Sequence, residues 1–199
     1  MWRKSRKHEF YTRLAREEGY PARSVYKLKE IDEKFHLIKK GDKVLDLGSA
    51  PGSWTLYLSR KVGNKGRVFG FDLEEIKIPL PSNVIFSQKD IAVLEESDFK
   101  EKYQAVVADL SPKTSGISEI DVARSLELSL NALEIAKVAL KKGGNFVCKI
   151  FETETTAMFF KKVEADFKYA KRFRPKAVIK GSREFYIIGK GFRQSIDKI

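Results

Sequence analysis

The chain has 199 residues, of which 42% are apolar, which is enough for one domain with a full hydrophobic core over residues 1–199. A single cysteine, Cys148, excludes an internal disulfide, and with only two histidines it excludes a Cys/His zinc site. No apolar run approaches the roughly 20 residues that cross a bilayer, and no signal-peptide core follows the charged start. The net charge of +12 suits an anionic partner. We expect a cytoplasmic monomer without metal or membrane contact.

In chain order, the apolar periodicity predicts four helices and seven strands. The predicted elements are helix Ser24–Phe35, strand Lys43–Leu47, helix Trp54–Lys61, strand Arg67–Asp72, strand Val84–Gln88, strand Ala105–Leu110, helix Asp121–Leu140, strand Asn145–Phe151, helix Thr155–Phe167, strand Ala170–Phe173 and strand Glu184–Lys190. Alternation of strands and helices predicts a Rossmann-like α/β fold, with a mostly parallel sheet and helices on both faces. The last two strands have no helix between them, so we expect an antiparallel hairpin there.

Both ends of the chain are strongly basic. Residues 1–29 hold nine Lys and Arg against three Glu, and residues 168–199 hold ten against two acidic residues. The aromatic residues interleaved with these charges are Phe10, Tyr11, Tyr20, Tyr26, Tyr169, Phe173, Phe185 and Tyr186. Cations neutralise phosphates and aromatic faces stack on bases. The pattern favours an RNA surface that includes residues 1–29, with two solvated basic tails as the alternative.

A glycine-containing turn joins the first predicted strand to the next helix. Gly48, Pro51 and Gly52 lie in this turn, at the carboxyl end of a strand, where open α/β sheets bind ligands. Gly48 and Gly52 would let the backbone approach a ligand that a Cβ would block. Asp72 ends the next strand and can accept hydrogen bonds from ribose hydroxyls. Asp90, after the third strand, could meet an adenine amino group.

The spacing of these glycines differs from G-x-G-x-x-G. This difference disfavours binding of a pyrophosphate and makes a nicotinamide dehydrogenase remote. A nucleoside without phosphates fits better, and S-adenosylmethionine is the common one. The alternative for the turn is a tight connection without a ligand.

Two charged residues lie where strands should be apolar. Asp109 follows Ala105–Ala108, and Lys149 lies within an apolar strand, both near the carboxyl edge of the sheet. They could form a buried salt bridge or a catalytic site. Moving a methyl from a sulfonium to an alcohol requires removal of the hydroxyl proton. A lysine amine can accept that proton when it is neutral, a form that burial or a second cation favours.

Five stretches, in this order, resemble the FtsJ/RrmJ (RlmE) family of ribosomal RNA 2′-O-ribose methyltransferases. They are residues 23–28 (RSVYKL), 46–54 (DLGSAPGSW), 109–112 (DLSP) with 115–116 (SG), 143–149 (GGNFVCK) and 182–186 (SREFY). The resemblance implies a catalytic tetrad of Lys27, Asp109, Lys149 and Glu184, in which Lys149 accepts the proton. By themselves, Lys27 and Glu184 could equally be solvated charges.

The same resemblance implies S-adenosylmethionine contacts at Gly52, Trp54, Asp72, Asp90 and Asp109. It also implies a target uridine ribose in the peptidyl-transferase region of 23S ribosomal RNA, within a large subunit or its precursor. One departure is Ser53, which stands where many members have a second glycine; serine is small, so we expect donor binding to be kept.

Other functions remain open at this point. Relatives of similar fold modify transfer RNA or messenger RNA caps, and a non-catalytic RNA-binding module would keep the basic ends without needing Lys149. Cys148 could be the nucleophile of a base methyltransferase, but adjacent strand residues point to opposite faces, so it would point away from Lys149. A small-molecule methyltransferase would not need the basic ends.

Overall fold

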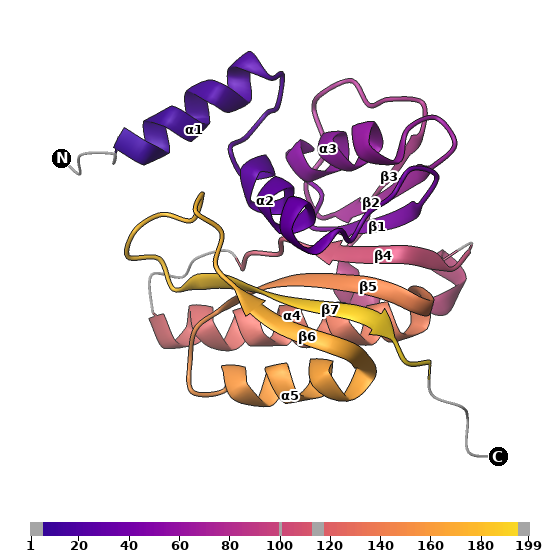
Figure 1. The fold of residues 1–199 in the computed structure, drawn as a ribbon, viewed down its shortest axis with the longest axis vertical. Helices are drawn as coiled ribbons and strands as arrows, with labels where there is room; N and C mark the ends of the chain where they lie inside the picture. Colours follow the sequence, from indigo (N-terminus) through magenta and orange to yellow (C-terminus); the bar gives the residue numbers. More distant parts are fainter. Residues whose placement is uncertain (1–5, 100, 113–117, 195–199) are drawn as a thin grey trace.

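A computed structural model describes residues 6–99, 101–112 and 118–194 (Figure 1). Its helices are α1 (Arg6–Glu17), α2 (Val25–Phe35), α3 (Ser53–Val62), α4 (Ser118–Ala139) and α5 (Thr156–Asp166). Its strands are β1 (Lys43–Leu47), β2 (Arg67–Asp72), β3 (Val84–Gln88), β4 (Tyr103–Ala108), β5 (Leu140–Phe151), β6 (Phe167–Phe173) and β7 (Glu184–Phe192). Two short 3₁₀ turns, Ile91–Val93 and Glu96–Asp98, lie between β3 and β4.

The seven strands form one sheet in the order β3-β2-β1-β4-β5-β7-β6. Strands β1 to β5 pair in parallel, while β7 lies antiparallel between β5 and β6. The predicted fold class is therefore confirmed, including the antiparallel last strand. Strand order reverses beside β1, because the chain moves outward to β2 and β3 and then returns to β4.

Helices cover both faces of the sheet, with α2 and α3 on one side and α4 and α5 on the other (Figure 1). Side chains that alternate along the strands pack into two separate hydrophobic cores, one on each face of the sheet. Leu45 and Leu47 belong to the core that includes Leu133 and Phe159 of α4 and α5, whereas Val44 belongs to the core that includes Leu28 of α2. Burying each such side chain contributes about 1.5–3 kcal/mol. Such alternation fixes which strand residues face the α2–α3 side.

Helix α1 and the start of β5 differ most from the sequence prediction; the other differences in bounds are of at most three residues. Helix α1 was not predicted, and it packs through few residues, among them buried Ala15 and Tyr11, whose ring centroid lies 5.2 Å from that of Tyr26. Strand β5 begins at Leu140 instead of Asn145, because Leu140 pairs with Tyr103 before the register shifts to regular pairing at Asn145.

None of the described helices is long and apolar enough to cross a membrane. Among the same residues, no group of three or more His, Cys, Asp or Glu side chains is gathered to hold a metal ion.

Candidate active site

The turn after β1 carries two glycines in left-handed conformations, with φ of 79° at Gly48 and 104° at Gly52. A Cβ on Gly52 would lie 2.9 Å from Ile78 Cδ1, and one on Gly48 would lie 3.0 Å from Leu110 Cδ2. Backbone conformation and the protein's own neighbours therefore require glycine at both positions. That a Cβ there would also block a ligand stays a prediction. The two glycines hold the turn at the end of β1.

Two carboxylates mark the ends of the next strands. Asp72, at the end of β2, accepts hydrogen bonds from the backbone N–H of Ala50 and of Glu74, each at 2.8 Å. Asp90 follows β3 and accepts from the Ala92 N–H at 2.9 Å. These bonds orient both carboxylates, and each oxygen keeps a second lone pair for a ligand hydroxyl or amino group.

Asp46 is fully buried in β1, on the α3 side of the sheet. Its Oδ2 accepts a hydrogen bond from the Thr55 hydroxyl at 2.7 Å, while its Oδ1 has no hydrogen-bond partner among the described residues. Burial raises the pKa of Asp46 to about 7, and the nearby charges of Asp109 and Asp72 act in the same direction. The carboxyl groups of Asp46, Asp72 and Asp109 thus lie near enough to act on one another, and a cationic ligand suits this concentration of negative charge. S-adenosylmethionine, which carries a sulfonium and an ammonium, meets that requirement.

Trp54 is the second residue of α3, and its indole is buried. The ring N–H donates to the Ser24 carbonyl at 2.9 Å, and the ring centroid lies 5.9 Å from that of Tyr186. The side chain therefore joins α3 to α2. A donor contact at Trp54 would have to come from its backbone, since first-turn N–H groups of a helix lack intrahelical partners.

The four residues of the expected tetrad lie together, although they come from four different elements or their ends. Lys27 Nζ of α2 lies 2.5 Å from Glu184 Oε1 of β7. Lys149 Nζ of β5 lies 3.4 Å from Asp109 Oδ1, just after β4. Lys149 also donates to the Asp109 carbonyl at 3.1 Å and contacts the Ser111 hydroxyl. The two ion pairs thus form one cluster at the carboxyl edge of the sheet.

A fifth residue, Tyr186, links the two ion pairs. Its hydroxyl lies 2.8 Å from Asp109 Oδ1 and 2.9 Å from Glu184 Oε1 and donates to these carboxylates. Tyr186 also lies directly opposite Lys149 on the paired strands. From the sequence, Tyr186 was a candidate base-stacking residue and the last residue of the stretch 182–186 that resembles the family. Its position two residues after Glu184, on the same strand face, could have indicated it.

The electrostatics of the cluster are balanced, with two amines facing two carboxylates. Burial opposes ionisation of Asp109, but the ammonium groups of Lys149 and Lys27 and the Tyr186 hydrogen bond outweigh it and lower its pKa. Burial, reinforced by Asp109 and Glu184, raises the pKa of Tyr186 well above its ordinary value. Asp109 is therefore a carboxylate and Tyr186 a neutral hydroxyl at physiological pH.

Cys148 is fully buried within the core on the α4–α5 side of the sheet. Val147, its neighbour, belongs to the opposite core, as alternation along β5 requires. Burial raises the pKa of the Cys148 thiol to about 12. A buried, protonated thiol is a poor nucleophile, so the base-methylation mechanism through Cys148 has no support in this geometry.

The interpretation of the terminal aromatic residues as base-stacking faces is only partly correct. Four of the eight are buried core residues and cannot stack on bases, namely Tyr20, Tyr26, Phe185 and Tyr186. Phe10 and Tyr169 are exposed. The four buried rings are part of the hydrophobic core. The number of aromatic residues near basic residues in the sequence does not show which of them are buried.

The sheet order, the carboxylates at the ends of β1 and β2 and the buried amine–carboxylate cluster beside them define a Rossmann-like methyltransferase. Residues 20–192 match the family model described as FtsJ-like methyltransferase, and the chain belongs to that family. This assignment confirms the prediction that S-adenosylmethionine is the methyl donor.

Individual relatives agree with this family. A protein of Desulforapulum autotrophicum named ribosomal RNA large subunit methyltransferase E is 45% identical over 92% of both chains. One of the same name from Lawsonia intracellularis is 44% identical over 94% of this chain and 96% of its own. Among solved structures, a ribosomal RNA methyltransferase of Plasmodium falciparum superposes with a TM-score of 0.76 at 25% identity, covering 87% of this chain and 98% of that one.

Proposed function

We propose that this chain transfers a methyl group from S-adenosylmethionine to the ribose 2′-hydroxyl of a uridine in 23S ribosomal RNA. Relatives of more than 40% identity over most of the chain carry the name of a large-subunit ribosomal RNA methyltransferase. The single observation that carries the chemistry is Lys149, an amine only 4% exposed in a strand core, paired with Asp109 beside the donor site. The enzyme acts in the cytoplasm as one domain, on a large subunit or its precursor.

When bound, S-adenosylmethionine supplies an electrophilic methyl on a sulfonium centre. Asp46 is completely buried, so it would act on the positive charge of the donor through its electrostatic field and not through direct contact. Asp72 and Asp90 would accept hydrogen bonds from its ribose hydroxyls and adenine amino group. The backbone of the turn from Gly48 through Pro51 and Gly52 to Trp54 would line the remaining side. These residues would hold the donor at the ends of β1, β2 and β3.

The Lys149 ammonium would first release a proton to solvent, and the neutral amine then takes the proton of the ribose hydroxyl, whose oxygen accepts the methyl group that S-adenosylmethionine would supply. Lys149 then becomes an ammonium, and the negative charge of Asp109 at 3.4 Å stabilises it. The Lys27–Glu184 pair and the Tyr186 hydroxyl hold Asp109 in place from the other side. The residues thus supply orientation and a proton acceptor, the two requirements of this transfer.

The direct test is to compare ribose methylation across all ribosomal RNA from cells with the gene present and deleted. We expect one 2′-O-methyluridine of the large-subunit RNA to disappear on deletion. The purified protein should restore it on isolated large subunits with S-adenosylmethionine. A methylation map unchanged by deletion, or a lost methyl group in transfer RNA instead, would overturn the proposal.

A further inference from the structure

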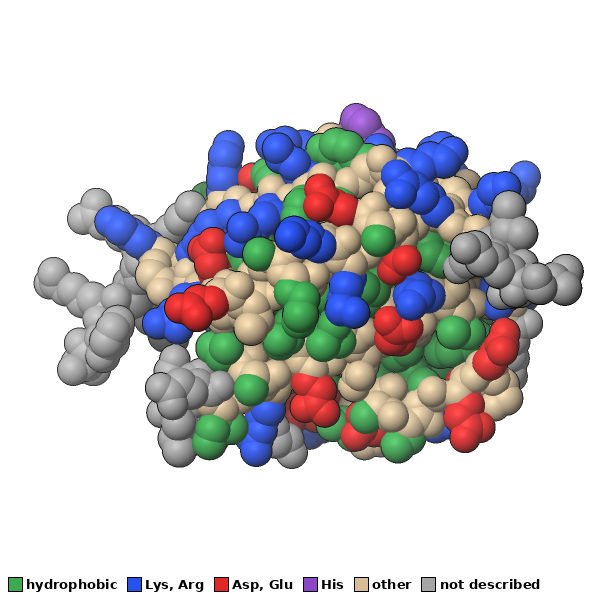
Figure 2. Space-filling model, turned by 90° about the horizontal axis from the view of Figure 1, so that it is seen from below, with side chains coloured by type: hydrophobic (Ala, Val, Ile, Leu, Met, Phe, Trp, Pro, Cys, Tyr) green, Lys and Arg blue, Asp and Glu red, His purple; other side chains and the backbone are tan. Residues whose placement is uncertain are grey.

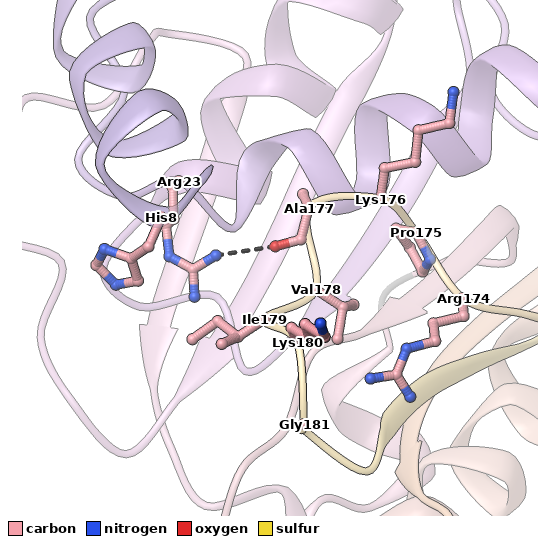
Figure 3. Close-up of a pocket in the computed structure, with 10 residues that line it drawn as sticks. All are labelled: His8, Arg23, Arg174, Pro175, Lys176, Ala177, Val178, Ile179, Lys180 and Gly181. Carbon is pink, nitrogen blue, oxygen red and sulfur yellow. Dashed lines mark hydrogen bonds between the residues drawn. The ribbon is translucent and has the colours of Figure 1, made fainter. Parts of the chain in front are cut away.

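A basic pocket of about 490 Å³ lies outside the donor site and the tetrad, between α1, the start of α2 and the β6–β7 loop. It is lined by His8 of α1, Arg23 just before α2, and residues 174–181 of the loop (Figure 3). Arg23 Nη1 donates to the Ala177 carbonyl at 2.9 Å, which ties the two sides together. We call these lining residues the loop pocket.

The sheet order places the loop pocket next to the catalytic cluster. Donor-binding residues lie at the ends of β1, β2 and β3, and the tetrad lies at β4, β5 and β7. The loop pocket follows beside β7 and β6, because Glu184 pairs with Phe151 and Phe173 pairs with Tyr186 at this same edge. Donor, methyl acceptor and loop pocket therefore lie in a row. An RNA chain whose 2′-hydroxyl lies at Lys149 could therefore extend to the loop pocket.

All of the charged side chains that line the loop pocket are positive. Residues 171–183 contain six Lys and Arg and no Asp or Glu, and no acidic residue lines the loop pocket. In Figure 3, the guanidinium of Arg23 lies among the lining residues, whereas the ammonium of Lys176 points away from the loop. Arg174 also donates to the Ser182 carbonyl, which holds the loop close to Glu184. Guanidinium groups of this kind bind phosphate oxygens through two parallel hydrogen bonds.

Apolar side chains complete the wall of the loop pocket. Val178 is buried, but Ile179 is 42% exposed beside these cations. A free phosphate ion would gain nothing from such a wall, whereas a nucleotide presents both a phosphate and an apolar sugar or base face. Charge and apolar surface together fit a nucleotide within an RNA strand.

We propose that the loop pocket binds a nucleotide that flanks the methylated one, with its phosphate held by Arg23, Arg174 and Lys180. This assignment rests on the proposed function, because it takes the ligand to be the RNA substrate. The loop pocket makes no contact with the reacting atoms. Its residues therefore contribute to RNA binding and not to the rate of methyl transfer.

The test uses the double variant Arg174→Gln/Lys180→Gln. We expect the KM for large subunits from gene-deleted cells to rise about tenfold or more, with kcat within about twofold. The variant loses binding energy that is equal in the ground state and the transition state, which raises KM and leaves kcat unchanged. Affinity for S-adenosylmethionine should stay unchanged. A second variant, Lys180→Glu, leaves the hydrogen bond between Arg174 and Ser182 in place, and it should raise KM in the same way.

The matched control is Lys161→Gln/Lys162→Gln on α5, which removes the same charge. Figure 2, seen from below Figure 1, shows a face on which basic and acidic side chains are intermingled with apolar ones. A KM of the loop-pocket variants within about twofold of this control would overturn the assignment. If the wild-type protein methylates no ribosomal RNA, the proposed function fails. In that case, binding of the same subunits to each variant, measured by filter retention, tests the assignment of the loop pocket. Equal retention by the loop-pocket variants and the control would overturn that assignment.

Discussion

At the scale of single residues, Asp46 carries a structural cost. Its carboxyl is buried, its pKa is about 7, and one oxygen has no hydrogen-bond partner among the described residues. An ordinary Asp has a pKa of 3.8, so the folded state holds a proton between about pH 4 and 7 that the unfolded state releases. Folding stability from this group therefore falls as pH rises through that window, by about 4 kcal/mol in total.

Asp46→Asn removes this cost because an amide does not ionise. We expect the variant to be more stable than the wild type at pH 8 by up to about 4 kcal/mol and nearly equal at pH 4. Urea unfolding at both pH values measures this difference. The same variant should bind S-adenosylmethionine more weakly, since one negative charge near the donor site is lost. A stability difference independent of pH would contradict the buried-carboxylate account.

Tyr186→Phe tests the link between the two ion pairs. Removing the hydroxyl deprives Asp109 and Glu184 of a shared donor, so we expect a loss of about 1–2 kcal/mol in unfolding free energy. Methyl transfer should slow, and donor binding should be kept because Tyr186 belongs to the tetrad side of the site. Unchanged transfer in a stopped single-turnover assay would show that the hydroxyl does not position the catalytic groups.

Individual charged residues of the site could be predicted from the sequence, whereas the hydrogen bonds and ion pairs that connect them could not. Lys149 and Asp109 stood out because a charge in an apolar strand is rare. Lys27 and Glu184 entered only through family resemblance, since each is locally an ordinary surface-type charge. Tyr186 was missed as a link because its role depends on strand pairing between β5 and β7, which residue type does not encode.

At the scale of elements, Asp32 joins the two helices that carry the site. The buried carboxylate of Asp32 on α2 accepts from the backbone N–H groups of Leu37 and Ile38, each at 3.0 Å. It also accepts from the Tyr57 hydroxyl of α3 at 2.8 Å and pairs with Lys61 at 2.7 Å. α2 carries Lys27, and α3 follows the donor-binding turn. Asp32 therefore holds the two halves of the active site together.

Asp32→Ala should destabilise the fold by about 3–5 kcal/mol, because it leaves buried donors and a lysine without their acceptor. Chemical denaturation measures this loss. Glu33→Ala, at an exposed position of the same helix, provides a control with an expected effect within about 0.5 kcal/mol. Were the Asp32 variant as stable as this control, α2 and α3 would be held together by apolar packing alone.

Element prediction succeeded where periodicity was strong. The bounds of β1, β2 and β3 agree with the sequence prediction, because each is a short apolar run between turn residues. Helix α1 was not predicted from the sequence, because few of its residues make apolar contacts. The end of α4 was placed one residue late, at Leu140, because that residue continues the helical spacing but pairs with Tyr103 in the sheet.

At the scale of the whole molecule, the uneven charge determines how the protein meets RNA. The net charge is +12, and both the N-terminal segment and the β6–β7 loop concentrate it. We expect affinity for ribosomal RNA to fall at least about tenfold between 50 and 200 mM salt, as expected for about two or more neutralised phosphates. Filter binding across a salt series measures this slope. An affinity that does not change with salt would mean that these cations do not contact phosphates.

The central claim is that Lys149 accepts the proton of the ribose hydroxyl. The most direct test is the single-turnover rate of methyl transfer by Lys149→Ala, measured beside its affinity for S-adenosylmethionine. We predict that transfer is abolished while donor affinity stays near that of the wild type. Retention of more than about a tenth of the rate, which corresponds to only about 1.4 kcal/mol of barrier, would remove Lys149 from the chemistry.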